Sequence, residues 1–195
     1  MTYWLEMFKD VFPSLASLLP LSECPEITFP FRNASLFPII LVGCLFSLSS
    51  HPARHYFGLM NISALFAHCL FYPYTLYWRI AIQLDIGFTC ISALSLVYKI
   101  PTWLKPMILA VSIAGYDIQW MNEVLYIGSM IYATLMISYR TLCKGITQEY
   151  ILSVMAMSLV PMSFLLNTQI CEWTSGVVSI NHVTFVSSLV VIYLT

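Results

Sequence analysis

Three residues that could do chemistry lie inside otherwise apolar stretches: His68, Asp85 and His182. A carboxylate in an apolar medium is costly unless it is paired or shared with a metal. Imidazole nitrogen is a zinc ligand, and zinc with an open coordination position makes bound water nucleophilic near neutral pH. We therefore interpret His68 and His182 as candidate metal ligands and Asp85 as a candidate catalytic residue that orients the water or joins the metal. Ser63 is a second candidate catalytic residue, although five residues of α-helix would turn it about 140° away from His68.

The same residue types also fit a purely structural arrangement. His68 and Asp85 could form a buried hydrogen-bonded pair, with His182 bonded to a backbone carbonyl. A separate histidine pair, His51 and His55, has the spacing of metal ligands on one helical face. Pro52 stands between them and opposes a regular helix, so we expect a turn that faces lipid headgroups there.

Seven apolar stretches must position these residues. The chain is 59% hydrophobic and only 9% charged, whereas a soluble domain carries roughly 25% charged residues. We therefore predict an all-α, polytopic membrane bundle with an N-terminal amphipathic, interfacial segment at 1–33 and a seven-helix transmembrane domain at 34–195. The predicted spans are 34–50, 57–75, 76–98, 103–119, 121–139, 149–167 and 177–194.

Loop charges predict the orientation of these spans. Lys and Arg prefer the cytoplasmic side of a membrane. The connections after spans 1, 3 and 5 hold most of the basic residues, namely Arg54, Lys99, Lys105, Arg140 and Lys144. The N-terminal segment and the other connections are mainly acidic. The N-terminus should therefore be outside or lumenal and the C-terminus cytoplasmic, which places His68, Asp85 and His182 at a similar depth near the outer face.

Composition also limits the partners and the compartment. With 8 Lys and Arg in the whole chain, no basic patch for nucleic acid is expected. Membrane lipid is the expected partner, with a membrane-protein partner as a second option. The expected location is the endoplasmic reticulum, the Golgi or the plasma membrane. No Cys-x-x-Cys occurs, which argues against a zinc ribbon or a thioredoxin site; Cys24 and Cys171 could pair if the outer side is oxidising.

The layout resembles the alkaline ceramidases and related CREST-type seven-span membrane hydrolases, with myomaker-like relatives as an alternative within the same group. That family carries Ser and His on the second span, Asp on the third and His-x-x-x-His on the seventh. The corresponding stretches here are Ser63–His68, Gln83–Ile86 and Asn181–Phe185. The acidic Cys24-Pro25-Glu26 and the Asn33-Ala34-Ser35 ahead of the first span also look like the calcium-binding N-terminal segment of ceramidases.

The resemblance implies a zinc-dependent hydrolase of ceramide-type lipid amides, with zinc on His68 and His182, the water positioned by Asp85, and calcium at the N-terminal segment. Two departures stand out. Ser63 precedes His68 by five residues, a longer spacing than the family pattern. Val178 and Val186 stand four residues either side of His182, where a second histidine of the seventh span would be. The chain is therefore either a divergent hydrolase or a relative that kept the bundle for lipid binding, membrane remodelling or complex assembly.

Overall fold

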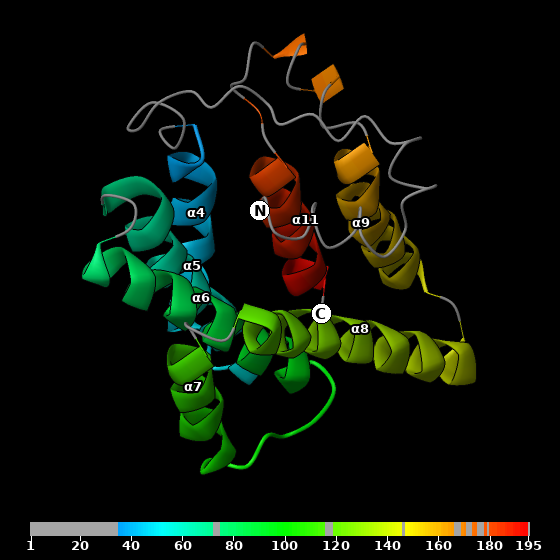
Figure 1. The fold of residues 1–195 in the computed structure, drawn as a ribbon. Coiled ribbons are helices and arrows are strands. Elements are labelled where there is room, and N and C mark those ends of the chain that lie inside the picture. Colours follow the sequence, from blue (N-terminus) through cyan, green and yellow to red (C-terminus); the bar gives the residue numbers. More distant parts are fainter. Residues whose placement is uncertain are drawn as a thin grey trace.

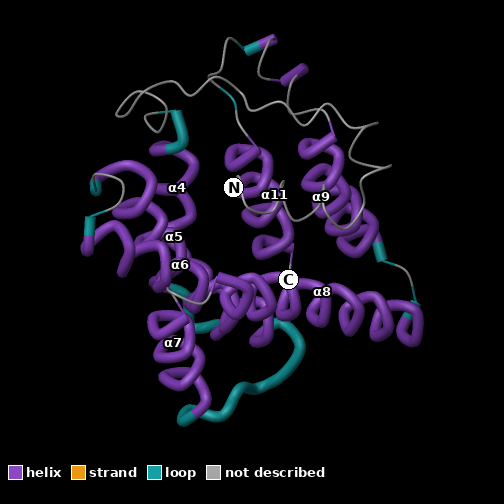
Figure 2. The backbone as a smooth tube through the Cα atoms, viewed as in Figure 1, coloured by secondary structure: helices purple, strands orange, loops and turns teal. Residues whose placement is uncertain are grey.

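A computed structural model describes residues 35–71, 75–115, 119–145, 147–165, 169–170, 173–174, 178 and 180–194. In this part of the chain all regular structure is helical, as Figure 2 shows, and the all-α prediction is confirmed. The elements are α4 (Phe37–Cys44), η1 (Leu45–Leu48), α5 (Pro52–Leu65), η2 (Phe66–Leu70), α6 (Leu76–Ser95), α7 (Leu104–Ala114), α8 (Gln119–Lys144), α9 (Gln148–Leu165) and α11 (Ile180–Leu194).

Each of the seven apolar stretches overlaps one of these helices, although α5 begins five residues before the second stretch and α8 extends beyond both ends of the fifth. The first stretch holds α4 with the 3₁₀ turn η1, and the second overlaps α5 and holds the π-helical turn η2. The predicted segment 1–33, with its calcium site and Cys24, lies outside the described residues, as does Cys171. None of the described helices combines the length and the apolar composition that crossing a bilayer requires.

The helices are arranged in two directions. In Figure 1, α4, α11 and α9 stand side by side, whereas α8 lies crosswise below α11 and α9, and α7 packs against α6 at that same end. The largest cluster of buried apolar side chains joins α4, α5 and α11 through Ile40, Phe57, Ala64, Phe185 and Ile192. This cluster fixes the relative position of the second and seventh apolar stretches, which carry the two candidate metal ligands.

Helix α5 approaches α4 and η1 closely at two glycines. A Cβ added to Gly43 would overlap the Asn61 amide, and a Cβ added to Gly58 would overlap the backbone of Phe46 and Ser47. Small residues allow helix backbones to approach in this way. Asn61 is fully buried at this contact and donates from Nδ2 to the Phe57 carbonyl oxygen at 2.9 Å.

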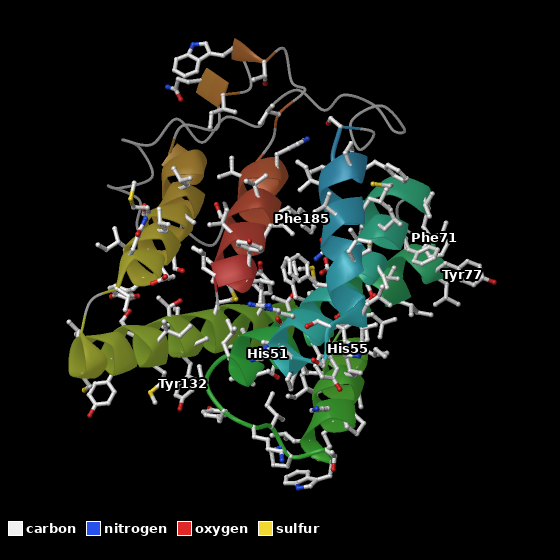
Figure 3. All side chains as sticks on the ribbon, turned by 180° about the vertical axis from the view of Figure 1, so that it is seen from behind. His51, His55, Phe71, Tyr77, Tyr132 and Phe185 are labelled. Atoms are coloured by element: carbon white, nitrogen blue, oxygen red, sulfur yellow. The ribbon has the colours of Figure 1, made fainter. Side chains whose placement is uncertain are left out.

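The turn predicted around His51 and His55 is wrong. Helix α5 begins at Pro52, and the His55 backbone N–H donates to the His51 carbonyl oxygen at 2.9 Å. Proline fits the first position of a helix because the N–H that it lacks would have no partner inside the helix there. The His55 ring donates from Nδ1 to the Ser47 carbonyl oxygen at 2.6 Å, so this imidazole joins α5 to η1. Figure 3 labels both histidines.

Candidate functional site

His68 lies in the middle of the π-helical turn η2, which directly continues α5. The Phe71 backbone N–H donates to the Phe66 carbonyl oxygen at 2.8 Å, which closes the wider five-residue turn. Single π-helical turns are rare and occur frequently at functional sites. The Phe66 and Phe71 rings stack beside this turn, with centroids 5.3 Å apart. The backbone therefore departs from regular helix at the residue that the sequence singles out.

His68 and Asp85 come together across α5 and α6. The distance from His68 Nε2 to Asp85 Oδ2 is 3.8 Å, and the side chains are 24% and 18% exposed. This separation is within ion-pair range but longer than a hydrogen bond. Both interpretations of the sequence predict this meeting, so it does not decide between them. The Thr89 hydroxyl donates to the Asp85 carbonyl oxygen at 2.8 Å, within α6.

His182 lies on α11 and is 8% exposed. Its Nε2 is hydrogen-bonded to the Ser35 hydroxyl at 2.9 Å. One turn further along α11, the Phe185 ring meets the His68 ring edge-on, with centroids 6.1 Å apart; Figure 3 shows Phe185 in the space between α11 and α4. The two histidines therefore belong to neighbouring elements, but the described contact of the His182 ring is Ser35.

The described residues contain no group of three or more His, Cys, Asp or Glu side chains close enough to hold a metal ion. His68 and Asp85 supply two donors of the types that zinc takes, and a catalytic zinc site uses three protein ligands. The arrangement therefore offers part of a zinc site, and zinc here stays a prediction.

Ser63 is directed to its own helix. Its hydroxyl donates to the Leu59 carbonyl oxygen at 3.2 Å, and among the described contacts none joins it to His68 or Asp85. A hydroxyl in a helix interior often bonds to the carbonyl four residues earlier. A catalytic role for Ser63 stays a prediction.

Three features of the site were not predicted from the sequence. They are the π-helical turn, the Phe185 ring against His68, and Tyr126 of α8, which lies within electrostatic range of the Asp85 carboxylate. The spacing of Phe185 three residues after His182 could have suggested that one face of α11 carries both, since residues three apart share a helix face. Tyr126 has no such signal, because its proximity depends on how α8 crosses α6.

Comparison with known proteins finds no match to a family model, to a curated protein or to a solved structure.

Proposed function

We propose that this chain is a multi-pass membrane protein that hydrolyses a lipid amide or ester. The observation that carries the proposal is the His68–Asp85 pair, held at 3.8 Å in and beside a π-helical turn. Burying a carboxylate and an imidazole in an apolar bundle costs free energy, and ionisable residues in such places usually have a function. The resemblance to alkaline ceramidases supports the lipid class.

The outer surface of the helices supports a membrane environment. Leu48, Leu135 and Leu142 are 86%, 63% and 71% exposed, and α4, η1 and α11 contain no Asp, Glu, Lys or Arg. Large exposed apolar surface marks contact with a membrane or a partner. Because such side chains occur on several helices rather than in one patch, we favour lipid as the neighbour, in the endoplasmic reticulum, the Golgi or the plasma membrane.

Hydrolysis of a lipid amide adds water to the carbonyl carbon, breaks the C–N bond and releases a fatty acid and an amine. The Asp85 carboxylate can take a proton from the attacking water and return it to the leaving nitrogen. His68, beside it, can orient that carboxylate. The Phe185 ring packs edge-on against the imidazole. Zinc, which the proposal assigns to His68 and His182, would supply a Lewis acid that activates water.

A second function is favoured by the Ser35 contact. Because the His182 Nε2 is bonded to a hydroxyl at 2.9 Å, this imidazole is accommodated in the bundle without a metal. The same bundle could then bind lipid, remodel the membrane or assemble with a membrane-protein partner without catalysis.

One experiment separates the two functions. The full chain is purified in detergent, its metal content is measured, and it is incubated with ceramide, other lipid amides and lipid esters while fatty acid release is followed. The hydrolase should hold about one zinc per chain and release fatty acid. His68→Ala should lose both, and Asp85→Asn should keep the metal while the rate falls about 10²–10⁴-fold.

His51→Ala is the matched control, because His51 is exposed ahead of α5 and makes no described side-chain contact with the pair. It should keep metal and activity. Folded protein that carries no metal and releases no fatty acid would contradict the hydrolase and leave the non-catalytic function standing.

A further inference from the structure

A cavity of about 250 Å³ lies between α5, α6, α8, α9 and α11. Its wall includes Phe57 from α5, Ala93 from α6, Ala133 from α8 and Ile192 from α11, all of which are buried. Two further lining residues, Thr134 of α8 and Val154 of α9, are exposed. The cavity is therefore closed by the bundle on one side and reaches the surface between α8 and α9.

The lining carries hydroxyl groups and, among the described residues, no charged side chain. Ser138, Ser153 and Ser188 come from α8, α9 and α11, three different helices, and within the described part of the chain none of these hydroxyls makes a hydrogen bond. The hydroxyls of Ser92 and Thr134, by contrast, already donate to the carbonyl oxygens of Ala53 and Met130 at 2.8 Å. Tyr150 of α9 also lines the cavity, and its phenolic hydroxyl makes no hydrogen bond within the described residues either, so four hydroxyls are left for a ligand.

The composition of the wall selects the ligand. A charged group buried without a partner is strongly disfavoured, whereas a hydroxyl or carbonyl can be satisfied by a serine hydroxyl. Binding sites of this kind combine an apolar wall with a few polar groups that fix orientation. The volume lies slightly below the roughly 300–1,000 Å³ of sites for drug-sized ligands, which fits part of one hydrocarbon chain better than a two-chain lipid.

The cavity does not include the His68–Asp85 pair. The lining residue of α6 nearest to Asp85 is Thr89, four residues later, and the rest follow towards the C-terminal end of that helix. On α5 the lining consists of Phe57 and Met60, and Met60 precedes His68 by eight residues. The cavity thus occupies the half of these helices away from the pair.

We propose that this cavity is a binding site of its own for an uncharged, single-chain lipid that bears a hydroxyl or carbonyl group. The ligand reaches it from the surface between α8 and α9. Its chain lies against Phe57, Ala93 and Ile192, and its polar group bonds to the hydroxyls of both Ser153 and Ser188. This site does not depend on hydrolysis at Asp85.

The test measures binding of two probes, tritiated hexadecanol and tritiated hexadecanoate at pH 8, to the full chain in detergent. Hexadecanol should bind at least tenfold more tightly, because only the carboxylate must bury a charge. Ser153→Ala and Ser188→Ala should each weaken hexadecanol binding about two- to tenfold, the loss expected for one neutral hydrogen bond. Ala93→Phe, which fills the cavity, should abolish it.

Ser158→Ala is the matched control, since Ser158 is also on α9 but lies outside the cavity and donates to the Met155 carbonyl oxygen. It should bind hexadecanol like the unmodified chain, as should His68→Ala. Equal affinity for the two probes, or equal effects of Ser153→Ala and Ser158→Ala, would overturn the proposal. Loss of hexadecanol binding in folded His68→Ala would overturn the separation from the pair while leaving the proposed hydrolase untouched.

Discussion

At the residue scale, the His68–Asp85 contact should be measurable as an interaction energy. Removing either partner leaves the other partly buried group without its charge neighbour. We expect a double-mutant cycle of His68→Ala and Asp85→Ala, read as the free energy of unfolding in detergent, to give a coupling of about 0.5–2 kcal/mol. The 3.8 Å separation and partial exposure keep this below the value for a fully buried pair.

A cycle of His51→Ala with Asp85→Ala provides the comparison and should be additive within about 0.5 kcal/mol. If the His68 cycle is equally additive, the His68 and Asp85 side chains do not interact measurably, and this would contradict a functional site at the pair.

The sequence could predict which residues matter but only part of their geometry. The predicted opposite directions of the second and third stretches place His68 and Asp85 at one level, and the structure brings the two side chains within 3.8 Å. The sequence offered His182 a metal ion or a backbone carbonyl but not the Ser35 hydroxyl, since Ser35 lies at the very start of the first stretch and meets α11 only through tertiary packing. The π-helical turn at His68 was not predicted either, because the sequence was read with regular α-helical spacing throughout α5 and η2.

At the element scale, the close approach of α4 and η1 to α5 predicts strongly position-dependent effects of adding a methyl group. Gly58→Ala should lower the free energy of unfolding by about 1–3 kcal/mol, because the new Cβ meets backbone atoms of Phe46 and Ser47 that cannot move aside. Gly43→Ala should cost less, because a side chain, the Asn61 amide, can shift.

Gly128→Ala in α8 is the matched control. A Cβ there meets nothing within 4 Å, and replacing glycine by alanine inside a helix stabilises it by about 0.5–1 kcal/mol. Thermal unfolding of the three variants in detergent measures the order. Equal destabilisation of Gly58→Ala and Gly128→Ala would contradict the close packing of η1 on α5.

The elements themselves follow from hydrophobic stretches and helix-terminating residues. Each predicted stretch overlaps a described helix, because a run of apolar residues that excludes charge also satisfies its backbone hydrogen bonds best as a helix. The turn predicted at Pro52 was wrong because the effect of a proline depends on whether it stands inside a helix or at its first position. The crosswise placement of α8 could not be predicted, since the apolar stretch gives the length of a helix but not its crossing angle.

At the scale of the whole molecule, the exposed apolar side chains and the uneven distribution of basic residues among the connections both support the proposed membrane placement. In the proposed membrane placement, lipid would cover the exposed apolar side chains and the basic connections would face the cytoplasm. The chain offers a direct probe of this arrangement, because Cys143 is exposed near the C-terminal end of α8, in a connection that the charges assign to the cytoplasm. Cys90, by contrast, is buried.

A variant that keeps Cys143 as its single cysteine should therefore resist a membrane-impermeant maleimide in sealed vesicles whose cytoplasmic face points inward. It should react fully once the membrane is permeabilised, because the reagent then reaches the cytoplasmic face. A variant that keeps only Cys90 should stay unlabelled in both conditions, which controls for reaction at buried thiols. Labelling of Cys143 before permeabilisation would reverse the orientation, and recovery of the chain in the soluble fraction without detergent would remove the membrane proposal itself.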